Sequence, residues 1–328
     1  LSALVRDLEG LPLAIELAAG WLRMLSAAQL RSRLDGQLRM LRRSRKGQGD
    51  RQATLMGAID ISWKMLQPWE QAALTQLSVF RGGFFVQAAE AVLDLSAWPE
   101  APWTLEVIST LVDSSLLRHS QELGQPRFGM YLSVREFAAD RLEAASAIQG
   151  PGKQDVTGPE AARATRGRHA EYFANLGDID TKEGLDEHDT LQRRKHLALE
   201  INNLMAGAQG ACDASLAKAA GACTLAAMEW LWITGPPDTA LHLCDRVFAE
   251  ANIPPIEEAR LCHWRAEILF LLGRSEAALK EVERSHEIAC ENGLRRAEGW
   301  ALLDFGRWSG AQGDPAQAIR LKLASWPA

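Results

Sequence analysis

The sequence lacks the features of several protein classes. No run of about 18 apolar residues occurs among its 328 residues, so no segment is expected to cross a bilayer. No basic stretch followed by an apolar one opens the chain, so no secretory signal is expected. The formal net charge is −6, which gives no general attraction to nucleic acid. With 47% hydrophobic and 24% charged residues, the composition is typical of a globular protein, and we expect it in the cytoplasm and not at a membrane.

Cysteine is scarce, and its spacing favours neither a disulfide framework nor a metal site. The sequence has five cysteines, an odd number, and none belongs to a CxxC pair. All five lie in apolar stretches with helical spacing: Cys212, Cys223, Cys244, Cys262 and Cys290. We therefore interpret them as reduced core residues of a cytosolic protein.

The patterns that mark catalytic or metal centres are also absent. The seven histidines include no HExxH motif, and no G-x-S-x-G segment occurs. His286 and Cys290 are four residues apart on one predicted helix face, and two candidate ligands alone favour packing over metal binding. We predict no catalytic residue and no metal ligand in this chain.

What is present indicates a mostly helical protein. Alanine and leucine are abundant, whereas strand-favouring residues are sparse outside two short stretches. Near the start, apolar residues follow helical spacing on both sides of Gly10-Leu11-Pro12. Because glycine ends helices and proline begins them, we expect a helix, a tight turn and a second helix from Pro12 to about Leu25. The basic, glycine-containing stretch from Arg39 to Arg51 is interpreted as an exposed linker.

Residues 51–146 are predicted to form a winged helix-turn-helix domain. Helical patterns cover residues 54–66, 68–77, 85–94 and 103–112. Two short extended pieces, Ser115–Arg118 and Arg127–Tyr131, flank the polar residues 121–126, which favours a β-hairpin. A helix from Ser133 to about Ala145 follows. Several helices, a hairpin and a final helix are the order of elements in a winged helix.

The predicted recognition helix lacks the positive charge that DNA-binding domains need. Its candidate recognition helix, Trp103 to Val112, contains Glu106 and neither lysine nor arginine, and Asp113 follows it. Recognition helices need basic side chains against phosphates and bases. We therefore predict that this chain does not bind DNA directly.

The remaining sequence predicts a linker and helical repeats. Residues 147–161 are rich in small and polar residues and lack periodicity, so we expect a flexible link. In residues 162–328, three segments that begin at Gly235, Gly273 and Gly313 share an alanine five positions later and an aliphatic residue six positions later. Their spacings of 38 and 40 residues slightly exceed the ~34 of a tetratricopeptide (TPR) unit.

The repeated pattern has a physical meaning. The glycine closes one helix, and Ala240, Ala278 or Ala318 lets the next helix pack closely against it. One such hairpin cannot bury its apolar face alone, so neighbouring units stack. The pattern predicts a TPR-like α-solenoid, truncated at the end of the chain; a generic helical bundle with chance matches is the alternative.

Five sets of residues follow one another along the chain: Gly10-Leu11-Pro12-Leu13-Ala14, Thr54–Leu66 with Leu77–Phe84, Leu111–Leu117, Val134–Ala138 and Glu200–Leu204. In this order they resemble STAND signalling ATPases, the group that includes NB-ARC proteins and bacterial transcriptional regulators with TPR sensors. The first of them resembles the GLPLA segment of this group. The matching segments are spread over residues 10–204.

The resemblance implies nucleotide contacts at particular residues. The proline of GLPLA lies against the adenine in this family, and Pro12, next to Gly10 and Leu11, matches it. A histidine of a Met-His-Asp motif makes a second contact. Here the aligned residues are Met130-Tyr131-Leu132, so Tyr131 occupies the histidine's position and the motif's aspartate is also absent.

The phosphate-binding part of such an ATPase is missing from the sequence. No G-x-x-x-x-G-K-[ST] loop occurs, so the chain has no scaffold for the β- and γ-phosphates and cannot hydrolyse ATP alone. Leu302-Leu303-Asp304 resembles the end of a Walker B strand but falls inside the repeats. We expect no cofactor in this fragment, and ATP or ADP with Mg in a full-length parent.

The resemblance therefore implies a regulatory and sensor fragment of a larger protein. Residues 1–50 would be the last helical part of the ATPase module, since Leu1 falls inside a predicted helix. The expected partners are the missing nucleotide-binding domain in cis and a protein or small-ligand inducer on the repeats. The output is expected to be transcriptional or another effector. The alternatives are a TPR scaffold without a nucleotide role, or an accessory region of a kinase or cyclase.

Overall fold

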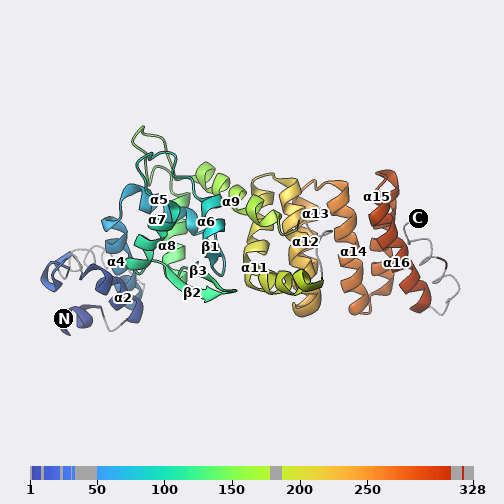
Figure 1. The fold of residues 1–328 in the computed structure, drawn as a ribbon, viewed down its shortest axis with the longest axis horizontal. Helices are drawn as coiled ribbons and strands as arrows, with labels where there is room; N and C mark the ends of the chain where they lie inside the picture. The colour runs from blue at the N-terminus through green and yellow to red at the C-terminus, as the bar shows by residue number, and fades with distance from the viewer. Residues whose placement is uncertain are drawn as a thin grey trace. The chain divides into compact units, whose positions relative to one another are not determined.

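The computed structural model describes residues 2–8, 11–22, 25–30, 32–33, 50–177, 187–311 and 320. Over these residues the chain is mostly helical, as the sequence predicted (Figure 1). The chain divides into two compact units, residues 1–165 and 166–328. Among the described helices, none has both the length and the apolar character needed to cross a membrane.

The first unit combines helices with a small antiparallel sheet. Its elements are α1 (Ser2–Asp7), α2 (Pro12–Trp21), α4 (Asp50–Met65), α5 (Pro68–Leu77), β1 (Phe84–Phe85), α6 (Val86–Val92), α7 (Thr104–Asp113), β2 (Arg118–Glu122), β3 (Gln125–Gly129), α8 (Leu132–Glu143) and the start of α9 (Pro159–Ala174). The strand order is β1-β3-β2. The hairpin thus returns to pair with a strand that precedes both α6 and α7.

The sheet differs from its sequence prediction in two places. Phe84 and Phe85 pair with Phe128 and Arg127 as strand β1, whereas the sequence placed residue 85 in a helix. The predicted turn over residues 121–126 is also wrong, because the strands continue to Glu122 and Gln125. Only Leu123 and Gly124 form the turn, with φ of 52° and 76°, and glycine adopts such a left-handed backbone without strain.

Aromatic residues form the core of the first unit. Phe84 is 1% exposed, and its ring centroid lies 4.5 Å from that of Phe80 and 6.0 Å from that of Phe128. These contacts join the end of the α5 region to the sheet. On the other side, Trp63 of α4 meets Phe137 of α8 edge to face at 5.8 Å.

The segment between α8 and α9 makes defined contacts within the first unit. The Ile148 amide donates to the Thr157 hydroxyl oxygen at 3.1 Å, and both residues are buried. The Gly158 amide donates to the Leu142 carbonyl of α8 at 2.7 Å. The flexible link over residues 147–161 stays a prediction. In the structure one bond closes the segment on itself, and the Gly158 bond attaches its later part to α8.

The second unit is helical throughout its described residues. It contains the end of α9, then α11 (Glu187–Asp213), α12 (Ala217–Thr234), α13 (Pro237–Glu250), α14 (Pro255–Leu271), α15 (Ser275–Glu291) and α16 (Arg295–Ala311). Successive helices pack on one another, and α12, α14 and α16 also contact their next-but-one neighbours in this series.

The repeated residues occupy related but not identical places. Ala240 of α13 and Ala278 of α15 are both fully buried near the starts of their helices. Gly273 has φ of 70° and ends α14 in the left-handed conformation, whereas Gly235 ends α12 with φ of −92°. The third copy, with Gly313 and Ala318, lies outside the described residues.

The cysteines fit the core interpretation only in part. Cys223, Cys244 and Cys262 are buried, and burial raises the pKa of the Cys244 thiol to about 12. Cys290 is exposed, so the core interpretation is wrong for it. Its Sγ lies 3.6 Å from Nε2 of His286, one turn earlier on α15.

Candidate functional site

The first candidate site is the junction between α2 and the end of the hairpin. Pro12 is the first residue of α2, Leu11 before it is extended, and the proline ring is exposed. Proline suits this position, since the first amide of a helix has no intrahelical partner. An exposed ring at a helix start is available to an external flat group. Gly10 lies outside the described residues.

Tyr131 lies beside this helix. It precedes α8 directly after β3, and its hydroxyl donates to Oε2 of Glu16 at 3.3 Å. Glu16 is one helical turn after Pro12. The Arg118 guanidinium lies over the Tyr131 ring, 5.5 Å from its centroid. Tyr131 therefore contacts α2 one helical turn after Pro12, although the two residues are far apart in the sequence.

Packing fixes α2 in the first unit. The Trp21 indole Nε1 donates to the buried Ser62 hydroxyl of α4 at 2.9 Å. A Cβ placed on Gly20 would lie only 3.0 Å from the carbonyl oxygen of Asp113, at the end of α7. The close approach therefore holds α2 against both α4 and α7.

The junction presents ring groups and charged groups from α2 and from both ends of the hairpin. Pro12 and Tyr131 offer two ring surfaces, and Glu16 and Arg118 offer one charge of each sign. No glycine-rich phosphate loop exists in the sequence. Glu16 and Arg118 were not singled out from the sequence. Their roles depend on contacts between distant segments.

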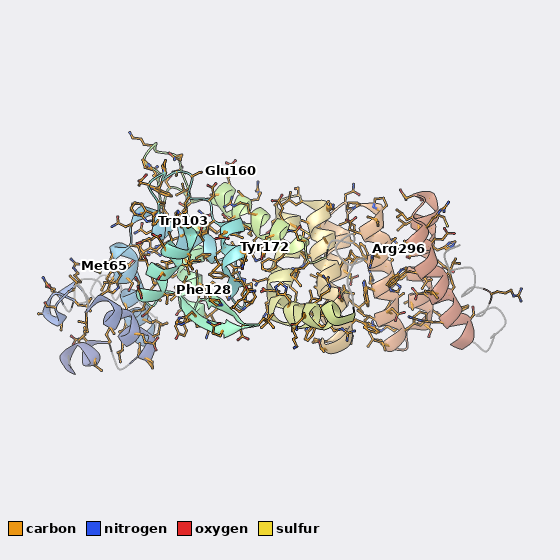
Figure 2. All side chains as sticks on the ribbon, in the orientation of Figure 1. Met65, Trp103, Phe128, Glu160, Tyr172 and Arg296 are labelled. Carbon is orange, nitrogen blue, oxygen red and sulfur yellow. The ribbon has the colours of Figure 1, made fainter. Side chains whose placement is uncertain are left out.

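The exposed surface of α7 is acidic and apolar. Val107, Ile108 and Leu111 face the core, while Glu106 and Asp113 are exposed. The helix has no lysine or arginine. At its start Trp103 is 83% exposed (Figure 2). This surface carries no charge complementary to a phosphate backbone.

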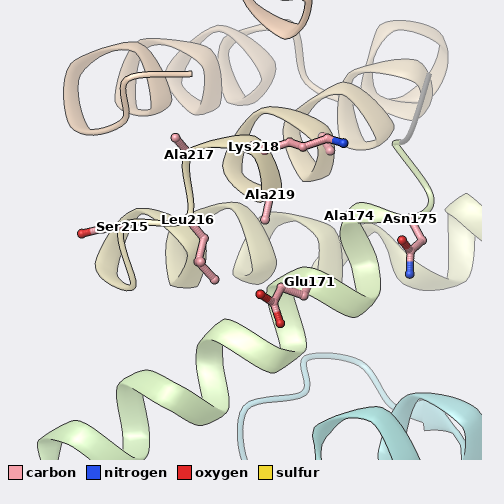
Figure 3. Close-up of a pocket in the computed structure, with 9 residues that line it drawn as sticks. Glu171, Ala174, Asn175, Ser215, Leu216, Ala217, Lys218 and Ala219 are labelled. Atoms are coloured by element: carbon pink, nitrogen blue, oxygen red, sulfur yellow. The ribbon is translucent and has the colours of Figure 1, made fainter. Parts of the chain in front are cut away.

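The second unit contains a cavity of about 490 Å³ between the end of α9 and the start of α12. Figure 3 shows Leu216 and Ala219 on one wall of it and Glu171 of α9 on the other. Of its nine lining residues four are alanines and four are polar, namely Glu171, Asn175, Ser215 and Lys218. A smaller cavity lies among α12, α14 and α16 and is lined by tryptophans and charged groups.

The structure gives Asp304 a place that the sequence motif did not predict. Asp304 is 1% exposed, and its Oδ2 lies 2.5 Å from Nδ1 of His263. It thus joins α16 to α14. The i, i+4 pair His263 and Glu267 could have been noticed from spacing alone, but its partner on α16 could not.

Comparison with known proteins gives partial matches. The chain is 31% identical over 204 residues to a Mycobacterium tuberculosis protein named "Putative HTH-type transcriptional regulator Rv0890c", covering 61% of this chain and 21% of that protein. A Mycobacterium bovis protein with the same description, Mb0914c, matches equally. "Uncharacterized protein Rv0894" of M. tuberculosis is 31% identical over 137 residues, 42% of this chain and 35% of that protein.

The matches cover part of this chain and part of each relative. No protein-family model matches it, and no solved structure matches it. The chain spans only about a fifth, 21%, of the length of the regulators that it matches. What the chain and these mycobacterial regulators share is therefore a 204-residue segment of similar sequence.

Proposed function

We propose that this chain is the regulatory and sensor portion of a STAND signalling ATPase that controls transcription. Residues 51–146 would be its winged helix, and residues 162–328 its TPR-like repeats. The observation that best supports the proposal is the β1-β3-β2 sheet, in which a strand, two helices and a returning hairpin follow one another as in a winged helix. The similarity to much longer proteins named HTH-type transcriptional regulators agrees with a regulatory role.

The α2 junction supports the nucleotide part of the proposal. The resemblance assigns Pro12 and Tyr131 to one nucleotide site, and the Tyr131–Glu16 hydrogen bond connects the two segments that carry them. In the proposed switch, ADP holds the missing nucleotide-binding domain closed against this junction. When the repeats bind an inducer, exchange of ADP for ATP is favoured, and this exchange releases the nucleotide-binding domain from the junction. Such a mechanism needs two states and a ligand with different affinity for each.

The nucleotide prediction concerns Pro12. In the natural longer polypeptide, Pro12→Ala is expected to weaken ADP binding about tenfold, because roughly two CH₂ groups of ~0.8 kcal/mol each leave the adenine. Pro68→Ala is the matched control, since Pro68 is also an exposed helix-starting proline but begins α5. Titration with ADP and Mg measures both. The 328-residue chain alone is expected to bind neither ATP nor ADP tightly.

Two results would contradict the nucleotide proposal. One is ADP affinity that Pro12→Ala and Pro68→Ala leave equally unchanged. The other is a natural longer polypeptide that contains no phosphate-binding loop and binds no nucleotide, which would favour the TPR-like scaffold instead.

The DNA prediction follows from the charge of α7. The chain is expected to show no salt-sensitive DNA binding, because α7 presents Glu106 and Asp113 and no basic residue. Fluorescence anisotropy with duplex DNA at low salt is the measurement. Sub-micromolar binding that disappears with salt and with Arg118→Gln would show instead that the hairpin and its neighbouring helices read DNA.

A further inference from the structure

A cavity of about 250 Å³ lies among three helices of the second unit. Each helix contributes one tryptophan to its lining: Trp232 from α12, Trp264 from α14 and Trp300 from α16. Trp232 and Trp264 lie with ring centroids 5.7 Å apart, and Trp232 and Trp300 are 37% and 41% exposed. The volume is below the ~300 to 1,000 Å³ of pockets for drug-sized ligands, so it suits a small ligand or a single side chain.

Two carboxylates face the same cavity. Glu267 comes from α14 and Asp304 from α16. Asp304 is almost fully buried, and although its Oδ2 contacts His263, its Oδ1 has no hydrogen-bond partner. A buried acceptor without a donor costs about 1–3 kcal/mol. Glu267, which when protonated hydrogen-bonds Asp304, and Arg307 are the nearby groups that could donate to this oxygen, and a cationic donor from outside the chain would compete with both.

Arg307 marks the place for a positive charge. Its guanidinium pairs with Glu267 and lies 3.7 Å from Oδ1 of Asp304, which is beyond hydrogen-bond distance. The Arg307 side chain is 57% exposed, so it can turn into water at little cost. A cation of better shape would therefore compete with Arg307 for both carboxylates.

The carboxylates of Glu267 and Asp304 lie beside two basic groups, Arg307 and His263. Burial raises the pKa of Glu267; Arg307 and His263 oppose that rise, and Asp304 adds to it. A positive ligand between the carboxylates would offset their repulsion. Tryptophan is also the aromatic residue that attracts cations most strongly through its ring face. The Trp300 ring already has the Arg260 guanidinium over it, 5.3 Å from its centroid, so a ligand cation would share this ring with Arg260.

We propose that this cavity binds an alkylammonium group, supplied either by a free small amine or by a lysine side chain of a protein. The ammonium group donates to Oδ1 of Asp304 and to Glu267, and the tryptophan rings surround its alkyl chain. The proposal names a ligand class for the proposed sensor role of the repeats. A role of this site in signalling rests on that proposed function. Binding itself is measured on the 328-residue chain without nucleotide, so it can fail or succeed independently of the ATPase proposal.

The first experiment compares matched probes by isothermal titration calorimetry. We expect n-pentylamine and 1,5-diaminopentane to bind with Kd below about 1 mM, and the neutral 1-pentanol to bind at least about tenfold more weakly. The peptide acetyl-Gly-Lys-Gly-amide presents the same group on a lysine. Tighter binding of the peptide assigns the source to a protein, and tighter binding of the free amines assigns it to a small molecule.

Variants then test the assigned contacts, because some are expected to weaken amine binding and one is expected to strengthen it. Glu267→Gln and Trp300→Leu are each expected to weaken amine binding about tenfold, and Glu283→Gln on the exposed face of α15 is expected to have no effect. Arg307→Gln is expected to strengthen binding, because it removes the competing cation. The Glu267 side chain is 14% exposed and Trp300 is 41% exposed, and Glu267→Gln keeps the size of the side chain, so both variants should fold; circular dichroism checks that they do.

Three outcomes would overturn the proposal. Equal binding of 1-pentanol and n-pentylamine would show a merely apolar cavity. Loss of binding in Arg307→Gln would show that the ligand is an anion. Since His263, Glu267 and Asp304 could also hold a metal ion, ZnCl₂ or MnCl₂ that binds tightly and excludes the amines would assign the site to a metal.

Discussion

Phe84→Ala is expected to lower the free energy of unfolding of the first unit by about 3–5 kcal/mol, the usual range for deleting a buried phenylalanine. Phe84 is 1% exposed and packs between Phe80 and Phe128. It also supplies half of strand β1, so its ring connects that strand to the hairpin. The loss should appear as faster hydrogen exchange in peptides from the end of α5 and from the sheet, because Phe80 and Phe128 pack against the ring.

Leu105→Ala is the control for this prediction. Leu105 belongs to the same unit but is 53% exposed at the start of α7, so its truncation should cost less than about 0.5 kcal/mol. Exchange in the second unit serves as an internal reference in both variants. If Phe84→Ala and Leu105→Ala change exchange equally, then Phe84 does not hold the sheet to α5, and the proposed winged-helix core loses its main support.

The difficulty of predicting β1 from sequence has a physical reason. The local 3.6-residue periodicity of apolar residues predicts helices such as α5 and α7, and their bounds agree with the prediction to within one residue. A two-residue strand has no periodicity of its own. Phe84 and Phe85 form a strand only because they pair with Phe128 and Arg127 in the fold. These partners are more than forty positions later in the sequence. Such pairing depends on tertiary contacts that local propensity does not encode.

The same distinction applies to the candidate sites. Pro12 could be singled out because its motif is local, and its place at the start of α2 followed from proline's own geometry. The Tyr131–Glu16 contact joins residues 115 positions apart, and no spacing rule would suggest it. The His263–Asp304 contact spans 41 positions in the repeats. There, Asp304 resembled part of an ATPase motif in sequence, whereas burial against α14 gives it a different chemical environment.

Ala278→Leu is expected to destabilise the second unit by about 1–3 kcal/mol, because it adds three carbon atoms to a filled contact between helices. Ala278 is fully buried near the start of α15, which packs against both α14 and α16. Small residues dominate these contacts: Ala259, Ala289 and Ala297 form one cluster, and Ala266, Val282 and Ala301 another. Helices that meet through alanines lie near the short end of the ~8–10 Å range of interaxial distances, so a leucine must push them apart.

Ala277→Leu is the matched control, since Ala277 is the adjacent residue of α15 but is exposed. It should change stability by less than about 0.5 kcal/mol. Thermal unfolding of both variants measures the difference, and hydrogen exchange locates it. Because contacts in a repeat array are between nearest neighbours, the loss in Ala278→Leu should concentrate in α14, α15 and α16 and fade toward α11. Equal melting of the two variants would mean that Ala278 is not a close-packing position. Loosening spread evenly over the whole unit would favour a single helical bundle over stacked repeats.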